Sequence, residues 1–332
     1  MSDLQKELQL GPSQQMFYEH APPRYVKVKP FVAGTFTLPE RSFVSPVDPE
    51  AKRLVPSLCF LIEQQNDDES SRRVLFDLGV RGKPESYTPE IQAHLKNRQP
   101  AYHDAASAVL TRNGISLDSI DAAIISHVHW DHHGDPSDYP QATFFVGHGA
   151  LDVLKNGLPG RGSHSHFDSD LFRGVNAVEF AEPVPGTGAF PDGSNITNIL
   201  QSDTVEPRWR PFPPFDAGMD FFQDGSVYLV PAPGHLPGHV NLLCQTGHKK
   251  WMYLAGDSFH DERLITGEKE IAVWEDNGQH FCIHLDKEAA EKHIARIREL
   301  MRHCKEAGVD LEVVASHDRN WLAANKHRCL NA

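Results

Sequence analysis

The sequence lacks two features that mark large classes of protein. It has no excess of basic residues, because 32 Lys plus Arg stand against 45 Asp plus Glu, a formal net charge of −13. An acidic chain repels the phosphate backbone of nucleic acids, and no run of Lys and Arg is long enough to offset that repulsion. No apolar run approaches the roughly 20 residues that span a membrane. We therefore expect neither a nucleic-acid partner nor a membrane partner.

Cysteine is also scarce, with five residues in the whole chain. They are scattered, mostly in apolar surroundings and without CxxC spacing: Cys59, Cys244, Cys282, Cys304 and Cys329. This pattern predicts reduced core residues and no disulfide framework. Residues 1–13 have no basic flank followed by an apolar core, so we expect a cytoplasmic protein.

The densest signal lies in residues 124–136, where four metal-capable side chains follow a short apolar run. They are His127, His129, Asp131 and His132. Alternation along extended backbone places the first two histidines on one side, and the other two residues follow after the chain turns. Imidazole and carboxylate ligands suit zinc, with iron, manganese or cobalt bound by the same chemistry. A polar loop that is merely rich in histidine is the weaker alternative.

Three further metal-capable residues each follow a predicted strand. His235 lies in a Pro-Gly-His turn, Asp257 follows an Ala-Gly pair, and His317 follows the last strand. Any one of them alone is more often a loop residue that caps or hydrogen-bonds its neighbours. Together with the first cluster, and in this order, they form a much more specific set.

Hydrophobic periodicity predicts strands separated by helices. Strands are expected at 26–37, 57–64, 74–76, 122–126, 144–146, 226–231, 240–245, 251–255 and 311–315. Helices are expected at 88–96, at 104–113 with Asp104 as N-cap, and from Asp286 to about Cys304. The apolar residues of the last helix form one stripe: Ala290, Ile294, Ile297, Met301 and Cys304.

The two halves of the chain repeat one pattern. A capped helix, a glycine, a short apolar strand and then Ser-His occurs at 104–127 and recurs at 286–317. This repetition predicts two similar sheet-plus-helix halves packed face to face, a four-layer αββα sandwich of the α/β class. We expect residues 1–25 to form an N-terminal arm and 26–332 to form a single domain.

Residues 157–224 lack regular pattern, which is typical of a functional loop system, and we interpret them as a substrate-pocket or lid insertion. The aromatic part of this segment includes Trp209, Phe215, Met219, Phe221 and Phe222. Two interpretations remain open: an apolar lid over the metals, or a satellite core beneath a loop.

The ordered metal-capable set resembles the metallo-β-lactamase-fold hydrolase superfamily, and is closest to its acyl-homoserine-lactone-type lactonases. The resemblance covers about residues 26–320 and implies a dinuclear site. By this pattern one metal is held by His127, His129 and His235, the other by Asp131, His132 and His317, and both by Asp257. It also implies that Asp77 is a buried residue that orients ligands by hydrogen bonds.

The resemblance implies hydrolysis of a small molecule, most simply opening of a lactone by a metal-bridging hydroxide, with Asp131 or Asp257 relaying a proton. Hydrolysis of a γ-lactam or a cyclic carbamate of the benzoxazolinone type is an alternative. A glyoxalase II-like thioesterase is another, and it needs a cationic entrance, for which Lys249-Lys250 and 208–210 are candidates. A scaffold without metals is disfavoured because all seven ligand positions are filled. Relatives are often dimers, so a homodimer is expected by analogy.

One position departs from the lactonase pattern. Those enzymes often place a tyrosine three residues after the bridging aspartate, where this chain has His260. An imidazole there could donate a hydrogen bond to the substrate carbonyl or protonate the leaving group. Alternatively, His260 caps the turn with Asp261 and never meets substrate.

Overall fold

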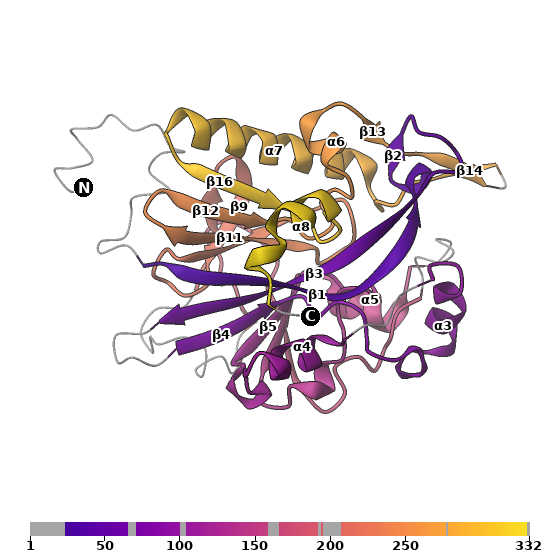
Figure 1. Ribbon diagram of the computed structural model, residues 1–332. Helices are drawn as coiled ribbons and strands as arrows, with labels where there is room; N and C mark the ends of the chain where they lie inside the picture. The colour runs from indigo at the N-terminus through magenta and orange to yellow at the C-terminus, as the bar shows by residue number, and fades with distance from the viewer. Residues whose placement is uncertain are drawn as a thin grey trace.

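Two six-stranded sheets face each other and carry helices on their outer sides (Figure 1). This computed structural model describes residues 24–65, 71–99, 104–158, 166–191, 194, 207–276 and 278–330. The predicted four-layer αββα sandwich is confirmed. Residues 1–23 of the predicted N-terminal arm lie outside the described residues.

The first sheet combines an antiparallel and a parallel part. Its strands, in spatial order, are β1 (Val26–Pro39), β3 (Lys52–Gln65), β4 (Ser71–Phe76), β5 (Ala122–Ile125), β6 (Thr143–Val146) and β7 (Asn176–Glu179). Strand β3 pairs antiparallel with β1 and β4, whereas β4 to β7 run parallel. The carboxyl ends of β4 and β5 therefore lie side by side at one edge.

The second sheet is mostly antiparallel. Its strands, in spatial order, are β16 (Asp310–Val314), β12 (Lys250–Leu254), β11 (Val240–Gly247), β10 (Val227–Pro231), β9 (Phe215–Asp220) and β8 (Arg210–Phe212). Only the β12–β16 pair among them is parallel. Two small ribbons pair β2 (Val44–Ser45) with β13 (Glu270–Ile271), and β14 (Trp274–Asp276) with β15 (Gln279–Phe281).

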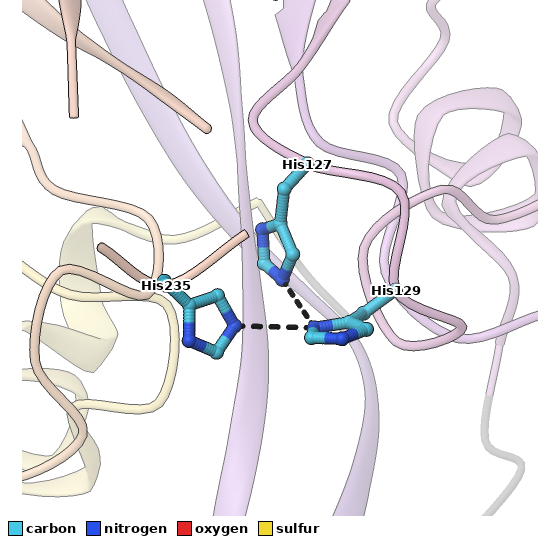
Figure 2. Close-up of side chains that lie close together, drawn as sticks. All are labelled: His127, His129 and His235. Carbon is cyan, nitrogen blue, oxygen red and sulfur yellow. Dashed lines mark hydrogen bonds between the residues drawn. The ribbon is translucent and has the colours of Figure 1, made fainter. Parts of the chain in front are cut away.

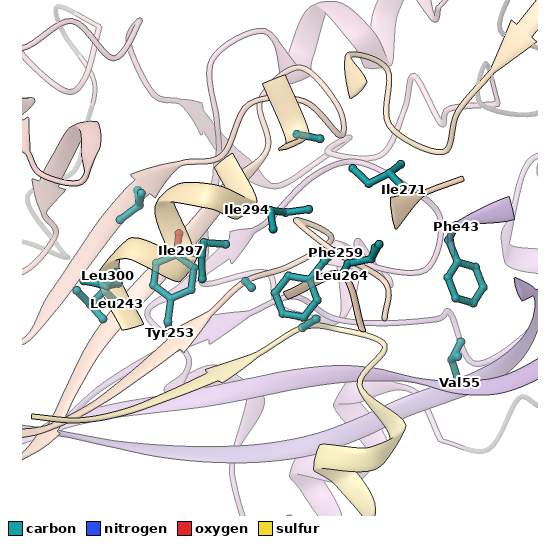
Figure 3. Close-up of a cluster of buried hydrophobic side chains, with 14 of the residues drawn as sticks. Phe43, Val55, Leu243, Tyr253, Phe259, Leu264, Ile271, Ile294, Ile297 and Leu300 are labelled. Carbon is teal, nitrogen blue, oxygen red and sulfur yellow. The ribbon is translucent and has the colours of Figure 1, made fainter. Parts of the chain in front are cut away.

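Helices complete the outer layers. Within the described residues, the α-helices are α3 (Pro89–Leu95), α4 (Ala106–Arg112), α5 (Ala150–Asn156), α6 (Glu262–Thr266), α7 (Lys287–Glu306) and α8 (Arg319–Asn325). Helices α4 and α5 share a buried cluster with the outer face of the first sheet. Helix α7 packs on the second sheet, with Ile297 and Leu300 beside Leu243 and Tyr253 (Figure 3). A third cluster fills the space between the sheets.

The long helix α7 begins where the sequence predicted. Asp286 accepts a hydrogen bond from the amide of Ala289 at 2.9 Å, which satisfies one of the free donors of the first turn. One member of the predicted stripe was wrong: Met301 is 38% exposed and Leu300 is buried instead. With 3.6 residues per turn, position 300 lies closer than 301 to the centre of the buried face.

The predicted N-cap of the earlier helix was also wrong. Helix α4 begins at Ala106 after Ala105, whose side chain makes no capping bond. Because the helix starts later than expected, Asp104 lies outside the cap position and pairs with Arg112 at 2.6 Å.

The aromatic segment is part of the core, so its interpretation as a lid was wrong. Trp209 is only 1% exposed, and its indole N–H donates to the carbonyl of Ala181 at 3.1 Å. Phe215 stacks on Tyr253 with ring centroids 5.7 Å apart. The β8–β9 ribbon extends the second sheet, so its side chains pack into the same interior as those of the neighbouring strands.

The repeated pattern lies where it can build one site. Helix α4 leads to β5 and Ser126-His127, and helix α7 leads to β16 and Ser316-His317, one unit in each sheet. Among the helices in the described ranges, none has the length and apolarity to cross a bilayer.

Candidate metal centre

Three histidine rings converge between the loops that follow β5 and β10 (Figure 2). Nε2 of His127 lies 2.9 Å from Nδ1 of His129, which lies 3.1 Å from Nε2 of His235. Ring nitrogens this close point to one small volume. Three imidazole nitrogens around one point are a common ligand set for zinc.

A second group lies directly beside the first. Nε2 of His317 is 3.5 Å from Oδ2 of Asp131, and Nε2 of His132 is 3.9 Å from the same oxygen. All three side chains are buried. Their donor atoms lie close enough together to coordinate one cation.

The carboxylate of Asp257 lies between the two groups. Its Oδ2 is 3.5 Å from Nε2 of His235 and 3.3 Å from Nε2 of His132, while Oδ1 is 3.2 Å from Nε2 of His317. The structure thus brings together all seven residues that the sequence singled out as ligands.

Hydrogen bonds on the outer side of two rings fix which nitrogen faces the centre. Nδ1–H of His132 donates to Asp77 at 2.8 Å, and Nδ1–H of His317 donates to the carbonyl of Pro56 at 2.8 Å. Each ring therefore presents Nε2 to the centre. Nε2 of His132 and Oδ1 of Asp257 are buried without a hydrogen-bond partner in the described residues, which fits a site built for cations.

Asp77 also holds the start of the ligand loop. Its Oδ1 accepts from the backbone N–H of Ser126 at 2.6 Å, and its Oδ2 accepts from the Ser126 hydroxyl at 2.8 Å. Its backbone has φ +60°, an uncommon conformation for a residue other than glycine. The turn at the end of β4 thus aims this carboxylate at two parts of the loop.

The neighbouring His239 supports the centre from behind. Its Nδ1–H donates to the carbonyl of Ala232 at 3.0 Å, and its Nε2 accepts the N–H of Asp257 at 3.1 Å. Burial lowers the pKa of His239 to about 4, so the ring stays neutral and can accept that bond. A Cβ on Gly256 would lie 2.5 Å from this ring, so the contact requires glycine. His133 points away from the centre and bonds the carbonyl of Gly134.

The charge states within the cluster follow from burial and the two carboxylates. Burial lowers the pKa of His127 and His235 well below the ordinary value, which leaves their lone pairs available. Burial opposes protonation of His132 as well, but Asp257 and Asp131 raise its pKa well above the ordinary value. In such a site a bound cation replaces the protons that otherwise compensate the carboxylates.

His260 faces the centre. Its Nε2 lies 3.0 Å from Oδ2 of Asp257, and its ring centroid is 5.2 Å from that of His235. The cap of α6 is provided by Asp261, whose Oδ1 accepts from the N–H of Arg263 at 2.8 Å. Asp261 therefore provides the capping bond itself, and a role of His260 toward substrate stays a prediction.

A small cavity of about 60 Å³ opens over the ligands. Phe36, Leu38, Trp130 and Ile283 supply apolar walls, and Arg98 is among the polar lining. Sequence reasoning missed these residues, because they reach the cavity only through long-range packing and belong to no local motif.

Part of the unpatterned segment also reaches the site. His166 lines the cavity, and Phe167 stacks on His129 with centroids 5.8 Å apart. Asp168 pairs with the buried Arg81 at 2.9 Å and so fixes this stretch to the turn after β4.

The buried histidine and aspartate side chains at the strand ends of this αββα sandwich form groups that could hold metal ions. No protein-family model matches the chain. Gamma-lactamase MBL2 of Gibberella moniliformis is 32% identical over 193 residues, which cover 56% of this chain and 70% of that protein. This identity and coverage show that the chain belongs to the metallo-β-lactamase-fold hydrolases.

Two further comparisons define the extent of the likeness. Cytochrome P450 monooxygenase mpaDE' of Penicillium brevicompactum is 31% identical over 288 residues, which are 80% of this chain but only 30% of that protein. The chain thus spans less than a third of that longer relative. A crystal structure of a quorum-quenching N-acyl homoserine lactone lactonase has a TM-score of 0.59 at 18% identity, covering 91% of this chain and 95% of that one. That likeness concerns the fold.

Proposed function

We propose that this chain binds two divalent metal ions and opens a small lactone. His127, His129 and His235 would hold one ion, and Asp131, His132 and His317 the other. The position of Asp257 is the observation that carries the proposal, because its two oxygens face both groups. The nitrogen-rich ligand set favours zinc, with iron, manganese or cobalt as other candidates.

The bound ions would supply Lewis acidity and lower the pKa of water to near neutrality. The side chains of the chain then provide proton transfer and orientation. Asp131 and Asp257 are buried carboxylates at the centre, so either can accept a proton as the nucleophile attacks. His260, next to Asp257, can donate a proton to the leaving group or a hydrogen bond to the carbonyl oxygen.

A γ-lactam is the second candidate substrate. The relative from Gibberella moniliformis, of whose length this chain covers 70%, is named as a γ-lactamase. An amide nitrogen is a poor leaving group until it is protonated, and His260 lies where it could supply that proton. The same reasoning extends to cyclic carbamates of the benzoxazolinone type.

A thioester substrate is less well supported, because the basic residues suggested for a cationic entrance lie away from the cavity. None of Arg208, Arg210, Lys249 and Lys250 is among the described residues that line the cavity. Lys250 begins β12 and Lys249 comes directly before it, whereas Asp257 follows the end of that strand.

Metal analysis combined with a substrate panel tests the proposal. Protein purified without chelator should contain about two transition-metal ions per chain and open lactones or γ-lactams faster than it cleaves thioesters. Chelation should abolish the activity, and zinc should restore it. A preparation that is free of metal and fully active would refute the metal-dependent mechanism.

Small-molecule substrates, a homodimer and the insertion at 157–224 as part of the substrate pocket remain predictions. Gel filtration with light scattering would measure the oligomeric state.

A further inference from the structure

Arg98 is the only lysine or arginine among the described residues that line the metal cavity. It follows α3, and its backbone is fixed on both sides. The N–H of Arg98 donates to the carbonyl of Leu95 at 2.9 Å, and its own carbonyl accepts from the N–H of Thr37 in β1 at 2.8 Å. The side chain therefore starts from a defined point on the cavity wall.

The guanidinium of Arg98 is oriented but not neutralised. Its Nε donates to Nε2 of His94 at 3.3 Å, which fixes the plane of the group. Among the described residues no Asp or Glu forms an ion pair with it. Its terminal amino groups thus keep donors for a ligand, in the fork geometry that matches a carboxylate.

Two other buried or partly buried arginines, unlike Arg98, each pair with a carboxylate. Arg53 pairs with Asp261 at 2.7 Å, and Arg81 pairs with Asp168 at 2.9 Å. A partly buried cation without a counter-ion is costly, which is why such groups are normally paired. The cavity wall therefore carries a charge that the described part of the chain does not compensate.

The nearby carboxylates are not available to compensate it. Asp131 and Asp257 both belong to the candidate metal centre. Asp131 interacts with Arg98 through its charge and forms no ion pair with it. Burial lowers the pKa of Arg98, with Asp131 opposing that shift, and a guanidinium remains charged near neutral pH. Within the described part of the chain no other carboxylate acts on Arg98, which leaves a ligand entering the cavity as the source of a counter-charge.

We propose that Arg98 binds a carboxylate carried by the substrate, so that the enzyme selects lactones or lactams with an acidic group beside the ring. This inference rests on the proposed hydrolase function. One arginine and a small cavity suit a monoanionic carboxylate, which two parallel N–H donors bind in one plane. The apolar walls formed by Phe36, Leu38 and Ile283 would hold the carbon skeleton.

The test uses pairs of lactones that differ only in a ring substituent, carboxylate in one and carboxamide in the other. Wild-type protein should prefer the carboxylate by roughly ten- to a hundred-fold in kcat/KM, the range expected of a charge-assisted pair of hydrogen bonds. Arg98→Gln should abolish the preference through KM, with metal content unchanged. Arg98→Lys should restore only part of it, because an ammonium lacks the planar fork.

Lys96→Gln is the matched control. Lys96 is an exposed residue at the end of the same helix, so its removal changes the net charge equally and should leave the preference intact. An equal fall of kcat for both members of each pair would overturn the proposal, since Arg98 would then act on the reacting carbonyl. Equal kcat/KM values for both members in wild-type protein would overturn it as well.

A binding measurement separates this inference from the hydrolase proposal. Calorimetry on metal-loaded protein measures the affinities for glutarate and for its monoamide. Each compound has one carboxylate for the metal centre, and only glutarate has a second carboxylate for Arg98. Wild-type protein should bind glutarate more tightly, and Arg98→Gln should bind both alike. If no lactone or lactam is opened, the proposed function fails, and equal binding of the two compounds by wild-type protein still refutes the role of Arg98.

Discussion

The partner of the outer ring nitrogen decides how each histidine meets the metal centre. His132 donates its Nδ1–H to the carboxylate of Asp77, whereas His317 donates its Nδ1–H to the carbonyl of Pro56, both at 2.8 Å. A carboxylate orients the ring and also makes it a better ligand through its charge. The contact with Asp77 should therefore contribute more to metal affinity.

Replacing Asp77 by asparagine should weaken metal binding by roughly ten- to a hundred-fold, the usual effect of losing a partner behind a metal-binding histidine. Competition with a chromophoric chelator measures the affinity. Asp104→Asn, which removes the surface partner of Arg112, is the control and should have no effect. An unchanged affinity in the Asp77 variant would show that the backbone alone orients the ligand loop.

His260→Ala should lower kcat by roughly ten- to a thousand-fold, because it removes the group placed to protonate the leaving atom or hydrogen-bond the carbonyl oxygen. Both metals should stay bound. The pH profile of kcat distinguishes a catalytic role from a packing role, and a profile identical to that of the wild type would retire the catalytic one.

The metal ligands could be predicted from the sequence because the first four lie in one local motif and the other three each follow a strand. Arg98 and Phe36 could not, since nothing near them in the sequence signals a site. Their place in the cavity depends on how α3 and β1 pack. Local motifs reveal the ligands, and tertiary packing determines the cavity walls.

At the scale of elements, helix α7 shows how a buried stripe anchors an outer layer. Ile294, Ile297 and Leu300 are buried against the second sheet (Figure 3). Met301 is 38% exposed. One residue along the helix rotates a side chain by about 100°. Neighbouring positions therefore differ sharply in their effect on stability.

Ile297→Ala should lower the free energy of unfolding by about 2 to 5 kcal/mol, because it leaves a cavity in a closely packed core. Met301→Ala should change it by less than about 0.5 kcal/mol, as expected at an exposed position. Urea denaturation of the two variants gives both values. The reverse order would mean that the helix faces the sheet with a different stripe.

The elements that escaped prediction are short or lie at or next to sheet edges. Strand β7 is the last strand of the first sheet and β8 is the last strand of the second, with β9 next to it. Strand β8 has only three residues, one of them Pro211. Helix α5 has seven residues and begins after Gly149, so neither its length nor a capping side chain marks its start. Tertiary contacts, rather than local propensity, stabilise such elements.

At the scale of the molecule, the centre joins the two sheets. His127, His129, Asp131 and His132 follow the first sheet, and His235, Asp257 and His317 follow strands of the second. Buried polar groups elsewhere also connect layers. His293 of α7 lies 2.9 Å from Oδ1 of Asn241 in β11, and burial lowers its pKa to about 3.

Acid should therefore destabilise the fold partly through His293. In the unfolded chain His293 takes up a proton near pH 6.5, whereas in the folded protein it does so only near pH 3. The contribution of neutral His293 to the free energy of unfolding is therefore complete above pH 6.5. It is lost as the pH falls from 6.5 towards 3. Between pH 6.5 and 5 the loss should be about 1 to 2 kcal/mol. His293→Gln should show a correspondingly shallower fall in urea denaturation, and identical slopes would contradict the account.

We propose that two cations share this one centre through Asp257. Diffraction from crystals of protein purified without chelator, measured above and below the metal absorption edge, would locate them. Two anomalous peaks are expected, one among His127, His129 and His235 and one among Asp131, His132 and His317. A single peak in fully active protein, or a peak away from these side chains, would rule out the shared centre.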